Sequence, residues 1–357
     1  MKSKHTFSII LTLVVIGLLV GSCTPPEQIK MRVLFAGSLI IPFDALEKAY
    51  EAEHPNVDVE MEGHGSIQAI RHVTDLHEEA DLVVTADYAL IPMLMYATDD
   101  PNTGQPYADW YIKFATNQLG LAYTPQSAYA AEINADNWYE MLTKPDVKIG
   151  ISDPRFDAAG YRMLMVLQLA ELAYDDPLIF ENITLGQFRI PIPTTQEGDK
   201  FVIEVPELVE TKPDGNIVMR GSSVQLIALL QSGDIDYAIE YESVIRQHDL
   251  EVIPLPSAVN LGDPDEAARY DQVQVRLDFQ RFASVEPVFN GEVIGYGVTI
   301  PTNAPHPEQA ADLIAFLLGP EGQAVLAEYS HPSLEPPVAD NYPALPEELQ
   351  VLCEPME

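Results

Sequence analysis

Residues 31–38 are Met-Arg-Val-Leu-Phe-Ala-Gly-Ser, a mostly apolar run that ends in a glycine and a serine. The apolar part predicts a buried β-strand, and Gly37-Ser38 predicts the turn that leads out of it. Beyond this turn Phe43, Leu46 and Tyr50 recur every three or four residues, which predicts an amphipathic helix. A buried strand followed directly by a helix is the basic unit of α/β proteins.

The same unit recurs further along the chain. Residues 57–61 predict a second strand, residues 63–66 (Gly-His-Gly-Ser) open a second helix, and residues 82–84 (Leu-Val-Val) predict a third strand. Strands that alternate with helices of this length predict an α/β fold with mixed, mostly parallel sheets.

The chain is longer than a single core usually allows. A cut before Cys23 leaves about 335 residues, whereas single cores rarely grow beyond about 250–300. Residues 119–123 predict a strand that leaves the first domain, and residues 251–255 predict a strand that crosses back. We therefore predict a first lobe made of residues 24–118 and 250–357, with residues 119–249 inserted as a second lobe. A ligand would then bind in the cleft between the lobes.

The first 23 residues predict export. Lys2 and Lys4 precede a mostly apolar run at residues 7–20, and Val-Gly-Ser-Cys follows at residues 20–23. This order is typical of a secretory signal peptide, and the run is too short to span a bilayer comfortably. Cys23 occupies the position that carries the lipid of bacterial and archaeal lipoproteins, which predicts a lipid anchor at the extracellular face of the cytoplasmic membrane. The alternative is an ordinary signal peptide followed by a chance cysteine.

The net charge of -36 narrows the choice of ligand. Nucleic-acid binding depends on Lys and Arg, so this composition argues strongly against it. It indicates a highly hydrated, self-repelling surface instead. An anionic ligand is still compatible with this charge, because helix amino ends bind anions without any Lys or Arg.

Four predicted helix starts combine a short polar residue with a nearby glycine: Gly37-Ser38, Gly65-Ser66, Asp157 before Ala158-Ala159-Gly160, and Gly221-Ser222-Ser223. A helix amino end leaves backbone N–H groups unpaired and carries about half a positive charge. Glycine beside such an end lets the backbone approach a ligand closely. Several ends in one cleft would hold a dianion, although each motif alone is explained as an ordinary helix cap or turn.

Longer motifs run through the whole mature chain: Val33-Leu-Phe-Ala-Gly-Ser-Leu39, Gly63-His-Gly-Ser66, Ala80-Asp-Leu-Val-Val-Thr-Ala-Asp87, Trp110-Tyr-Ile-Lys-Phe-Ala-Thr-Asn-Gln118, Gly160-Tyr-Arg162 and Asp236-Tyr-Ala-Ile-Glu-Tyr-Glu-Ser-Val244. Together they resemble the archaeal-type tungstate/molybdate-binding proteins of ABC importers, which are relatives of bacterial molybdate-binding proteins. The resemblance implies a two-lobed, type II periplasmic-binding-protein fold that closes on a tetrahedral oxyanion. It implies no cofactor and no enzymatic activity.

The resemblance also implies which residues contact the ligand. The serine contacts of the family match Ser38, beside Gly37, and Ser66. Its carboxylate at the start of a second-lobe helix matches Asp157, which Ala158 and Ala159 follow. Its tyrosine contact matches Tyr241.

One position departs from the family pattern. The family has a glutamate eighteen residues before the tyrosine, and this chain has Ser223 there. In the family, two carboxylates are thought to complete six ligands around the metal of the oxyanion; here Asp157 alone would remain as an inner-sphere carboxylate. Carboxylates repel a dianion unless they bind its metal, so we expect hydrogen bonds to dominate. Asp157 is equally explained as a helix cap, and Asp153 is the alternative match.

Several other residues are assigned roles outside the site. Strand alternation places Glu240 and Glu242 on the face opposite Tyr241, which predicts solvated or importer-facing side chains. No His-Glu-x-x-His spacing occurs, which argues against a zinc site. Cys353 lies in a Pro-rich tail that begins near His331 and is expected to be inert.

These expectations describe a monomeric receptor that binds tungstate or molybdate and delivers it to an ABC permease. A receptor for sulfate or phosphate is the alternative, and Ser223 makes it less remote. A hydrolase using Ser38 or Ser223 is expected less, because no histidine falls in the motifs around Ser223 and Tyr241. A sensing role without an importer is a further alternative.

Overall fold

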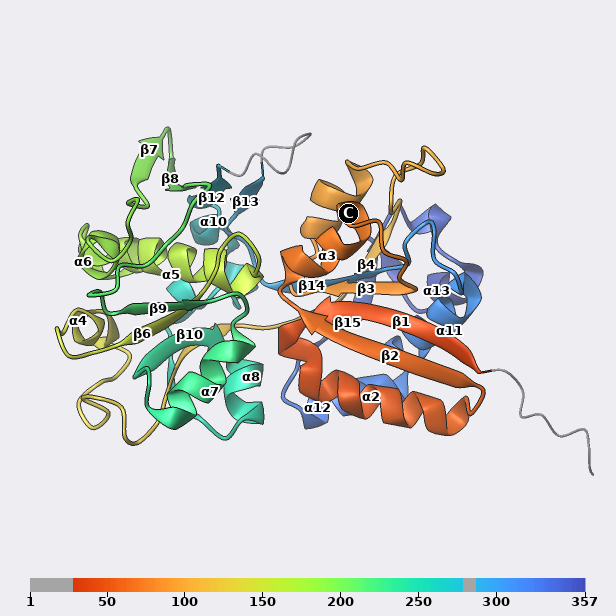
Figure 1. The fold of residues 1–357 in the computed structure, drawn as a ribbon, viewed down its shortest axis with the longest axis horizontal. Helices are drawn as coiled ribbons and strands as arrows, with labels where there is room; N and C mark the ends of the chain where they lie inside the picture. Colours follow the sequence, from red (N-terminus) through yellow and green to blue (C-terminus); the bar gives the residue numbers. More distant parts are fainter. Residues whose placement is uncertain (1–27, 279–286, 357) are drawn as a thin grey trace, which may run out of the picture.

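The computed structural model describes residues 28–278 and 287–356. These residues form three mixed β-sheets with helices packed against them, and they divide into two lobes that lie side by side (Figure 1). The predicted signal peptide and Cys23 lie outside the described residues.

Lobe 1 is built on a seven-stranded sheet of order β16-β15-β4-β14-β3-β1-β2. Its strands are β1 (Ile29–Ala36), β2 (Val57–His64), β3 (Leu82–Thr85), β4 (Tyr111–Thr116), β14 (Gly295–Thr299), β15 (Ser333–Asp340) and β16 (Glu354–Pro355). β1 pairs in parallel with β2 and β3, whereas β14 runs antiparallel to β3 and β4. The predicted strand at residues 31–35 is confirmed, and its burial follows from its central place in the sheet.

The helices of lobe 1 are α2 (Ile40–Glu53), α3 (Ser66–Thr74), α11 (Pro307–Leu318), α12 (Pro320–Glu328) and α13 (Glu347–Gln350), with shorter turns η1 (Gly37–Leu39), η2 (Ile91–Tyr96) and η4 (Tyr342–Ala344). They lie on both sides of the sheet (Figure 1). Phe43, Leu46 and Tyr50 are buried, so the predicted apolar face of α2 is confirmed. Within the described residues no single helix has the length and apolar character to cross a membrane; α11 and α12 together pass that test by length and composition, but a bend of 60° separates them.

Lobe 2 contains a five-stranded sheet of order β11-β5-β10-β6-β9 and a four-stranded sheet of order β13-β12-β8-β7. The strands are β5 (Leu119–Tyr123), β6 (Ile149–Ser152), β7 (Thr194–Glu197), β8 (Lys200–Val205), β9 (Ile217–Arg220), β10 (Tyr237–Tyr241), β11 (Glu251–Pro254), β12 (Val273–Leu277) and β13 (Val288–Asn290). The helices and turns are α4 (Trp138–Leu142), α5 (Ala158–Tyr174), α6 (Ile179–Thr184), α7 (Val224–Ser232), α8 (Glu242–Gln247), α9 (Ser257–Asn260), η3 (Pro264–Glu266) and α10 (Ala267–Tyr270). Helix α5 contacts strands of both sheets, and its first fourteen residues are buried, as expected for a helix that is apolar on nearly all sides.

The chain crosses between the lobes twice, and the second crossing differs from the prediction. The first lies at residues 117–118, between β4 and β5, as expected. Residues 251–255 do not cross back, because β11 pairs with β5 inside lobe 2. The chain continues in lobe 2 through β12 and β13, and it reaches lobe 1 only at β14. Residues 250–278 and 287–290 therefore belong to lobe 2, and the predicted boundary at residue 250 is wrong.

The Pro-rich C-terminal segment forms part of the main sheet of lobe 1. β15 pairs antiparallel with β4 and places residues 333–340 in the main sheet of lobe 1. The Glu335-Pro336 peptide bond is cis, and the register shifts between Ser333 and Val338, so the strand accommodates its two prolines at an irregular stretch.

Candidate anion-binding site

The residues that the sequence singled out lie together where the two lobes meet. Ser38 follows β1 and Ser66 follows β2, and the arrowheads of both strands point toward lobe 2 (Figure 1). Asp157 precedes α5, and Tyr241 ends β10. All four are at least 95 % buried in the structure, although each lies at the end of a strand or helix. The carboxyl ends of strands and the amino ends of helices are the usual place for a ligand in α/β proteins.

The backbones of the two lobes touch at this site. The Phe156 carbonyl oxygen of lobe 2 accepts hydrogen bonds from the Ile67 and Gln68 amides of α3, at 3.2 and 3.3 Å. A Cβ atom on Gly65 would lie 2.4 Å from the same oxygen, which is too close for any side chain. Glycine at this helix start therefore permits the lobes to close on each other.

The Gly37-Ser38 pair also lies against the opposite lobe. A Cβ atom on Gly37 would lie 3.1 Å from Ser222 Oγ, so the absence of a side chain at Gly37 lets the start of η1 approach the start of α7 closely. Ser222 and Ser223 are both buried. Ala158 and Ala159, at the start of α5, are buried as well, so the predicted helix starts do converge on one region.

The two serines of lobe 1 are fixed by neighbouring polar groups. Ser66 Oγ accepts a hydrogen bond from the Ala86 amide at 3.0 Å, so the proton of this hydroxyl is available to a ligand. Ser38 Oγ lies 2.9 Å from the Tyr296 hydroxyl, which also accepts from Asn117 Nδ2 at 3.2 Å. Tyr296 and Asn117 were not singled out from the sequence, because they come from β14 and from the first crossing.

Asp157 links two helix starts. Its Oδ1 accepts from the Ala159 amide at 3.2 Å, which caps α5, and its Oδ2 accepts from the Ser223 amide at 2.6 Å. Burial raises the pKa of Asp157, while the Ser223 and Ala159 amides act in the opposite direction. Asp157 is thus a helix cap, and a direct bond from its carboxylate to a ligand stays a prediction. The alternative match, Asp153, pairs with Arg155 at 2.5 Å.

The prediction of four polar caps is wrong for three of the helix starts. Neither the η1 start nor the starts of α3 and α7 has a side-chain capping bond. At α3 the backbone oxygen of Phe156 bonds the free amides instead, and at α7 the carboxylate of Asp157 takes the Ser223 amide. The acceptors at these two helix ends come from other parts of the chain, which local sequence does not reveal.

Arg162 is the main residue that the sequence analysis missed. It is 2 % exposed, and its Nη1 donates to Tyr241 Oη at 2.7 Å and to the Ala86 carbonyl of lobe 1 at 2.6 Å. Its Nη2 lies 3.3 Å from Asp87 Oδ2, and Asp87 also accepts from the Tyr161 hydroxyl. The guanidinium therefore places a positive charge beside the site and joins lobe 2 to lobe 1. The available indication was a charged residue in the first, mostly apolar half of α5.

Glu240 and Glu242 are not solvated, so that prediction is wrong. Glu240 is fully buried, and Glu242 is 9 % exposed. Glu240 does lie on the opposite face of β10 from Tyr241, but α7 and α8 pack against β10 and exclude water from it. Glu242 bonds to Arg246 and to Gln118 Nε2.

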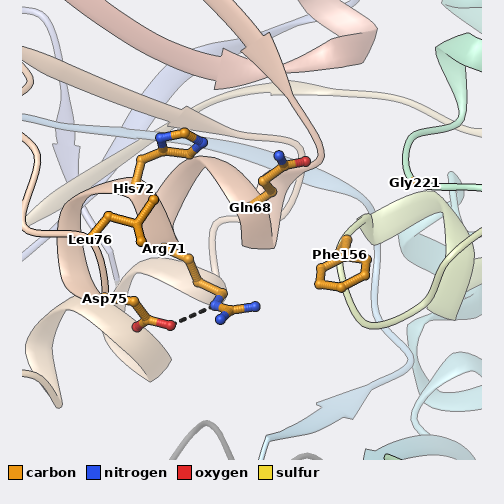
Figure 2. A pocket seen from close by; sticks show the side chains of 7 residues that line it. All are labelled: Gln68, Arg71, His72, Asp75, Leu76, Phe156 and Gly221. Atoms are coloured by element: carbon orange, nitrogen blue, oxygen red, sulfur yellow. Dashed lines mark hydrogen bonds and ion pairs between the residues drawn. The ribbon is translucent and has the colours of Figure 1, made fainter. Parts of the chain in front are cut away.

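A cavity of about 400 Å³ opens between the lobes next to the site. It is lined by Gln68, Arg71, His72, Asp75 and Leu76 from lobe 1 and by Phe156 and Gly221 from lobe 2 (Figure 2). Figure 2 shows the Arg71 guanidinium reaching from α3 toward Phe156, while its Nε donates to Asp75 Oδ2 at 2.7 Å. Phe156 and Gln68 line this cavity and also make the contact between the lobes, so the cavity lies directly beside the site.

The arrangement suits binding rather than bond breaking. Buried hydroxyl groups from both lobes lie where the lobes meet, and the Arg162 guanidinium supplies positive charge beside them. No group of three or more His, Cys, Asp or Glu side chains within residues 28–278 and 287–356 is placed to hold a metal ion. Two lobes, two crossings and a buried polar site between them define a solute-binding protein of the periplasmic-binding type.

The chain belongs to the bacterial extracellular solute-binding protein family, whose model matches residues 31–329. The molybdate/tungstate-binding protein WtpA of Thermococcus kodakarensis is 39% identical over 341 residues, which cover 94% of this chain and 90% of that protein. A solute-binding protein of Methanoculleus marisnigri is 37% identical over 370 residues and covers 99% of both chains. These relatives confirm the family that the sequence motifs indicated.

Solved structures confirm the two-lobed fold. The periplasmic molybdate-binding protein of Azotobacter vinelandii superimposes with a TM-score of 0.52 at 14% identity, covering 84% of this chain and 98% of that chain. The sulfate-binding protein SubI of Mycobacterium tuberculosis superimposes with a TM-score of 0.51 at 14% identity, covering 87% and 88%. The family is one of solute-binding proteins, and the fold is the two-lobed fold that these structures share.

Proposed function

We propose that this protein captures tungstate or molybdate between its lobes and delivers the anion to an ABC permease. The observation that carries the proposal is the set of buried hydroxyl donors at the lobe interface. Ser66 Oγ and Tyr241 Oη each accept a bond from the protein, so the proton of each hydroxyl is directed elsewhere. The 39% identity to a protein named for molybdate/tungstate binding supports this choice of anion.

The chemistry of the site suits a tetrahedral dianion. Such an anion offers only acceptors, and the donors next to the proposed site are the hydroxyls of Ser66 and Tyr241 and the Arg162 guanidinium. Closure removes water, which strengthens each of these interactions. A rigid ring of donors fits one anion radius best, so cavity size would separate the larger metal oxyanions from sulfate.

A sulfate or phosphate receptor is the second candidate. Ser223 replaces the second carboxylate of the family pattern, and both Asp157 oxygens already accept backbone amides. A site without free carboxylates has less means of binding a metal centre directly. Sulfate needs no inner-sphere ligand, so it would compete with the metal oxyanions for this site through hydrogen bonds alone.

Isothermal titration of residues 24–357 with tungstate, molybdate, sulfate and phosphate tests the proposal. We expect tight binding of the two metal oxyanions and no measurable heat with sulfate. Tyr241→Phe removes a hydroxyl donor to a charged ligand and is expected to weaken binding by about 10- to 100-fold, since such a bond contributes about 1.5–3 kcal/mol. The matched control is Tyr237→Phe on the same strand, whose hydroxyl donates to the Ala128 carbonyl, and it should leave affinity unchanged. A preference for sulfate or phosphate would transfer the proposal to the second candidate, and no heat with any of the four anions would refute both.

The lipid anchor is a separate proposal with its own test. We infer from residues 1–23 that the chain is exported, lipidated at Cys23 and held at the extracellular face of the cytoplasmic membrane. Cys23→Ser is then expected to move the protein from the membrane fraction to the soluble fraction, with anion affinity unchanged. An unaltered membrane fraction in this variant would contradict the anchor and leave the anion proposal standing.

A further inference from the structure

Glu240 is a fully buried carboxyl group for which the proposed capture of an anion has so far no use. It lies at the carboxyl end of β10, on the face against which α7 packs. Its Oε1 accepts from the Tyr241 amide at 2.7 Å. Its Oε2 is enclosed and makes no hydrogen bond to any described residue. Burying a polar atom without a hydrogen-bond partner costs free energy, so the placement of this oxygen requires an explanation.

The neighbour of Glu240 is Ser223, the residue that departs from the family pattern. The Ser223 hydroxyl lies close enough to the Glu240 carboxyl to act on its pKa. The Ser223 amide donates to Asp157 at the site. Ser223 therefore stands between the Glu240 carboxyl and the point where the two lobes close.

Glu240 favours its neutral form in these surroundings. Burial raises its pKa to about 8; the Tyr241 amide and Ser223 hydroxyl oppose the rise, whereas the Asp157 carboxylate adds to it. At pH 7 the group is therefore mostly a carboxylic acid, which has a proton to donate.

The protonation of Glu240 decides what the Ser223 hydroxyl does. A hydroxyl has one proton, and an ionised Glu240 would take that proton in a hydrogen bond. A neutral Glu240 donates its own proton to Ser223 Oγ, and the Ser223 proton is then free to point at the ligand. Only the second arrangement offers a donor to an anion.

We propose that Glu240 is a positioning residue of the anion site, which donates its proton to Ser223 Oγ and thereby directs the Ser223 hydroxyl at the bound oxyanion. The inference rests on the proposed function and adds a selection rule to it. A site in this form offers hydrogen-bond donors and no acceptor. It therefore favours fully deprotonated dianions such as tungstate, molybdate or sulfate over hydrogen phosphate, whose own proton needs an acceptor. Glu240 thereby compensates for the family glutamate that Ser223 replaces, by a hydrogen bond instead of a bond to the metal.

The pH dependence caused by Glu240 has to be distinguished from that of the other titratable groups around it. Charged or titratable side chains on the elements that pack against β10 are Asp157 at the start of α5, Tyr161, Arg162, Glu171 and Tyr174 of α5, Tyr123 of β5, and Glu242 and Arg246 of α8; Tyr296 of β14 also interacts with Glu240. Burial raises the pKa of Glu171 to about 7, and the Glu240→Gln profile separates its titration from that of Glu240. Neither α7 nor β6 carries a charged residue. Burial raises the pKa of Tyr296, so its hydroxyl stays protonated between pH 7 and 9.5.

The first test is the pH profile of tungstate affinity, because tungstate stays a dianion over the whole range. If only the form with neutral Glu240 binds, affinity falls by about 30-fold between pH 7 and 9.5 for a pKa of about 8. Glu240→Gln keeps a donor of the same shape and cannot ionise, so we expect wild-type affinity at pH 7 and a flat profile. Glu242→Gln is the matched control on the adjacent residue and should keep the wild-type profile.

The second test is a double-mutant cycle at pH 7. Glu240→Ala should weaken tungstate binding by about tenfold in the wild-type chain and have little effect when Ser223→Ala is already present, because Glu240 acts through that hydroxyl. Thermal unfolding of the ligand-free variants checks that each is folded, and the Gln variant carries the test if the Ala variant is not.

The outcomes separate the two proposals. Tungstate binding with a flat wild-type profile, or with the same fall in Glu240→Gln, overturns the role of Glu240 and leaves the receptor proposal intact. Additive losses in the cycle also overturn it. No binding of any oxyanion at any pH overturns the receptor proposal and this inference together.

Discussion

Replacing Arg162 by methionine is predicted to weaken anion binding far more than it weakens the fold. Arg162 belongs to lobe 2, but its bonds to the Ala86 carbonyl and to Asp87 end in lobe 1. Methionine fills a similar volume and makes neither bond. In the closed form of the variant, Asp87 keeps the Tyr161 hydroxyl as a donor but loses its cation.

The size of the effect follows from the burial of the pair. The side chains of Arg162 and Asp87 are 3% and 5% exposed, and removing one partner of such a pair costs about 3–5 kcal/mol. The Tyr161 hydroxyl offsets part of the loss, so we take the lower value of about 3 kcal/mol. These bonds join the lobes, so the cost falls on closure, and affinity for tungstate should weaken by about 150-fold.

The assay compares Arg162→Met with Arg32→Met by isothermal titration and thermal unfolding. Arg32 pairs with Glu62 at 2.7 Å and with Glu78 at 2.6 Å, and all three residues belong to lobe 1. The control should therefore lose stability without losing more than about threefold in affinity, a difference of under 1 kcal/mol. A loss of less than fivefold in Arg162→Met, or an equal loss in the control, would refute the reasoning that Arg162 holds the closed form.

Three further predictions follow from single residues. In Gly65→Ala the added Cβ would lie 2.4 Å from the Phe156 oxygen, so titration should show much weaker binding while the melting temperature of the ligand-free protein hardly changes; normal affinity would mean that the lobes close differently. Burial lowers the pKa of His331 to about 3, so the unfolded chain binds a proton below pH 6.5 that the folded protein excludes, and stability is lost as the pH falls. Urea unfolding at pH 7 and 5 should show about 2 kcal/mol of loss from this residue, absent in His331→Leu, and equal losses in both would contradict it. Burial raises the pKa of Cys353 to about 11, so in residues 24–357 this single thiol should react with a thiol reagent only in denaturant, and rapid labelling of the native protein would contradict its enclosure.

Local sequence was enough to predict the parts of the fold that form within one strand–helix unit. Residues 33–36 form an unbroken apolar run because this part of β1 is buried on both faces, and the turn that follows is encoded locally by Gly37-Ser38. The spacing of Phe43, Leu46 and Tyr50 likewise depends only on the helix that carries them.

Sequence alone did not predict which sheet a strand joins. Residues 251–254 have the composition of a strand in either lobe, and only their pairing with β5 places them in lobe 2. The same limit applies to residues 333–340, whose partner β4 lies far away in the sequence. Pairing between distant segments has no local pattern, which is why the boundary at residue 250 was wrong and the pairing of residues 333–340 was not predicted.

Part of the site was predicted from motifs, and the residues whose place depends on packing were missed. Ser38 and Ser66 were singled out as helix starts and Tyr241 through the resemblance of its motif; all three lie where the lobes meet, and their contact with a ligand stays a prediction. The alternation that separates Glu240 from Tyr241 is correct, but it does not reveal that α7 buries the other face. A buried charge such as Arg162 is likewise defined by its partners.

Anomalous diffraction from crystals grown with tungstate tests the central claim most directly. For residues 24–357 we predict one strong peak at the tungsten absorption edge, enclosed by Ser38, Ser66 and Tyr241, with anion oxygens about 3 Å from their hydroxyls. A peak in the cavity beside Arg71 and Phe156 instead, or no peak at a tungstate concentration that saturates binding, would contradict the account.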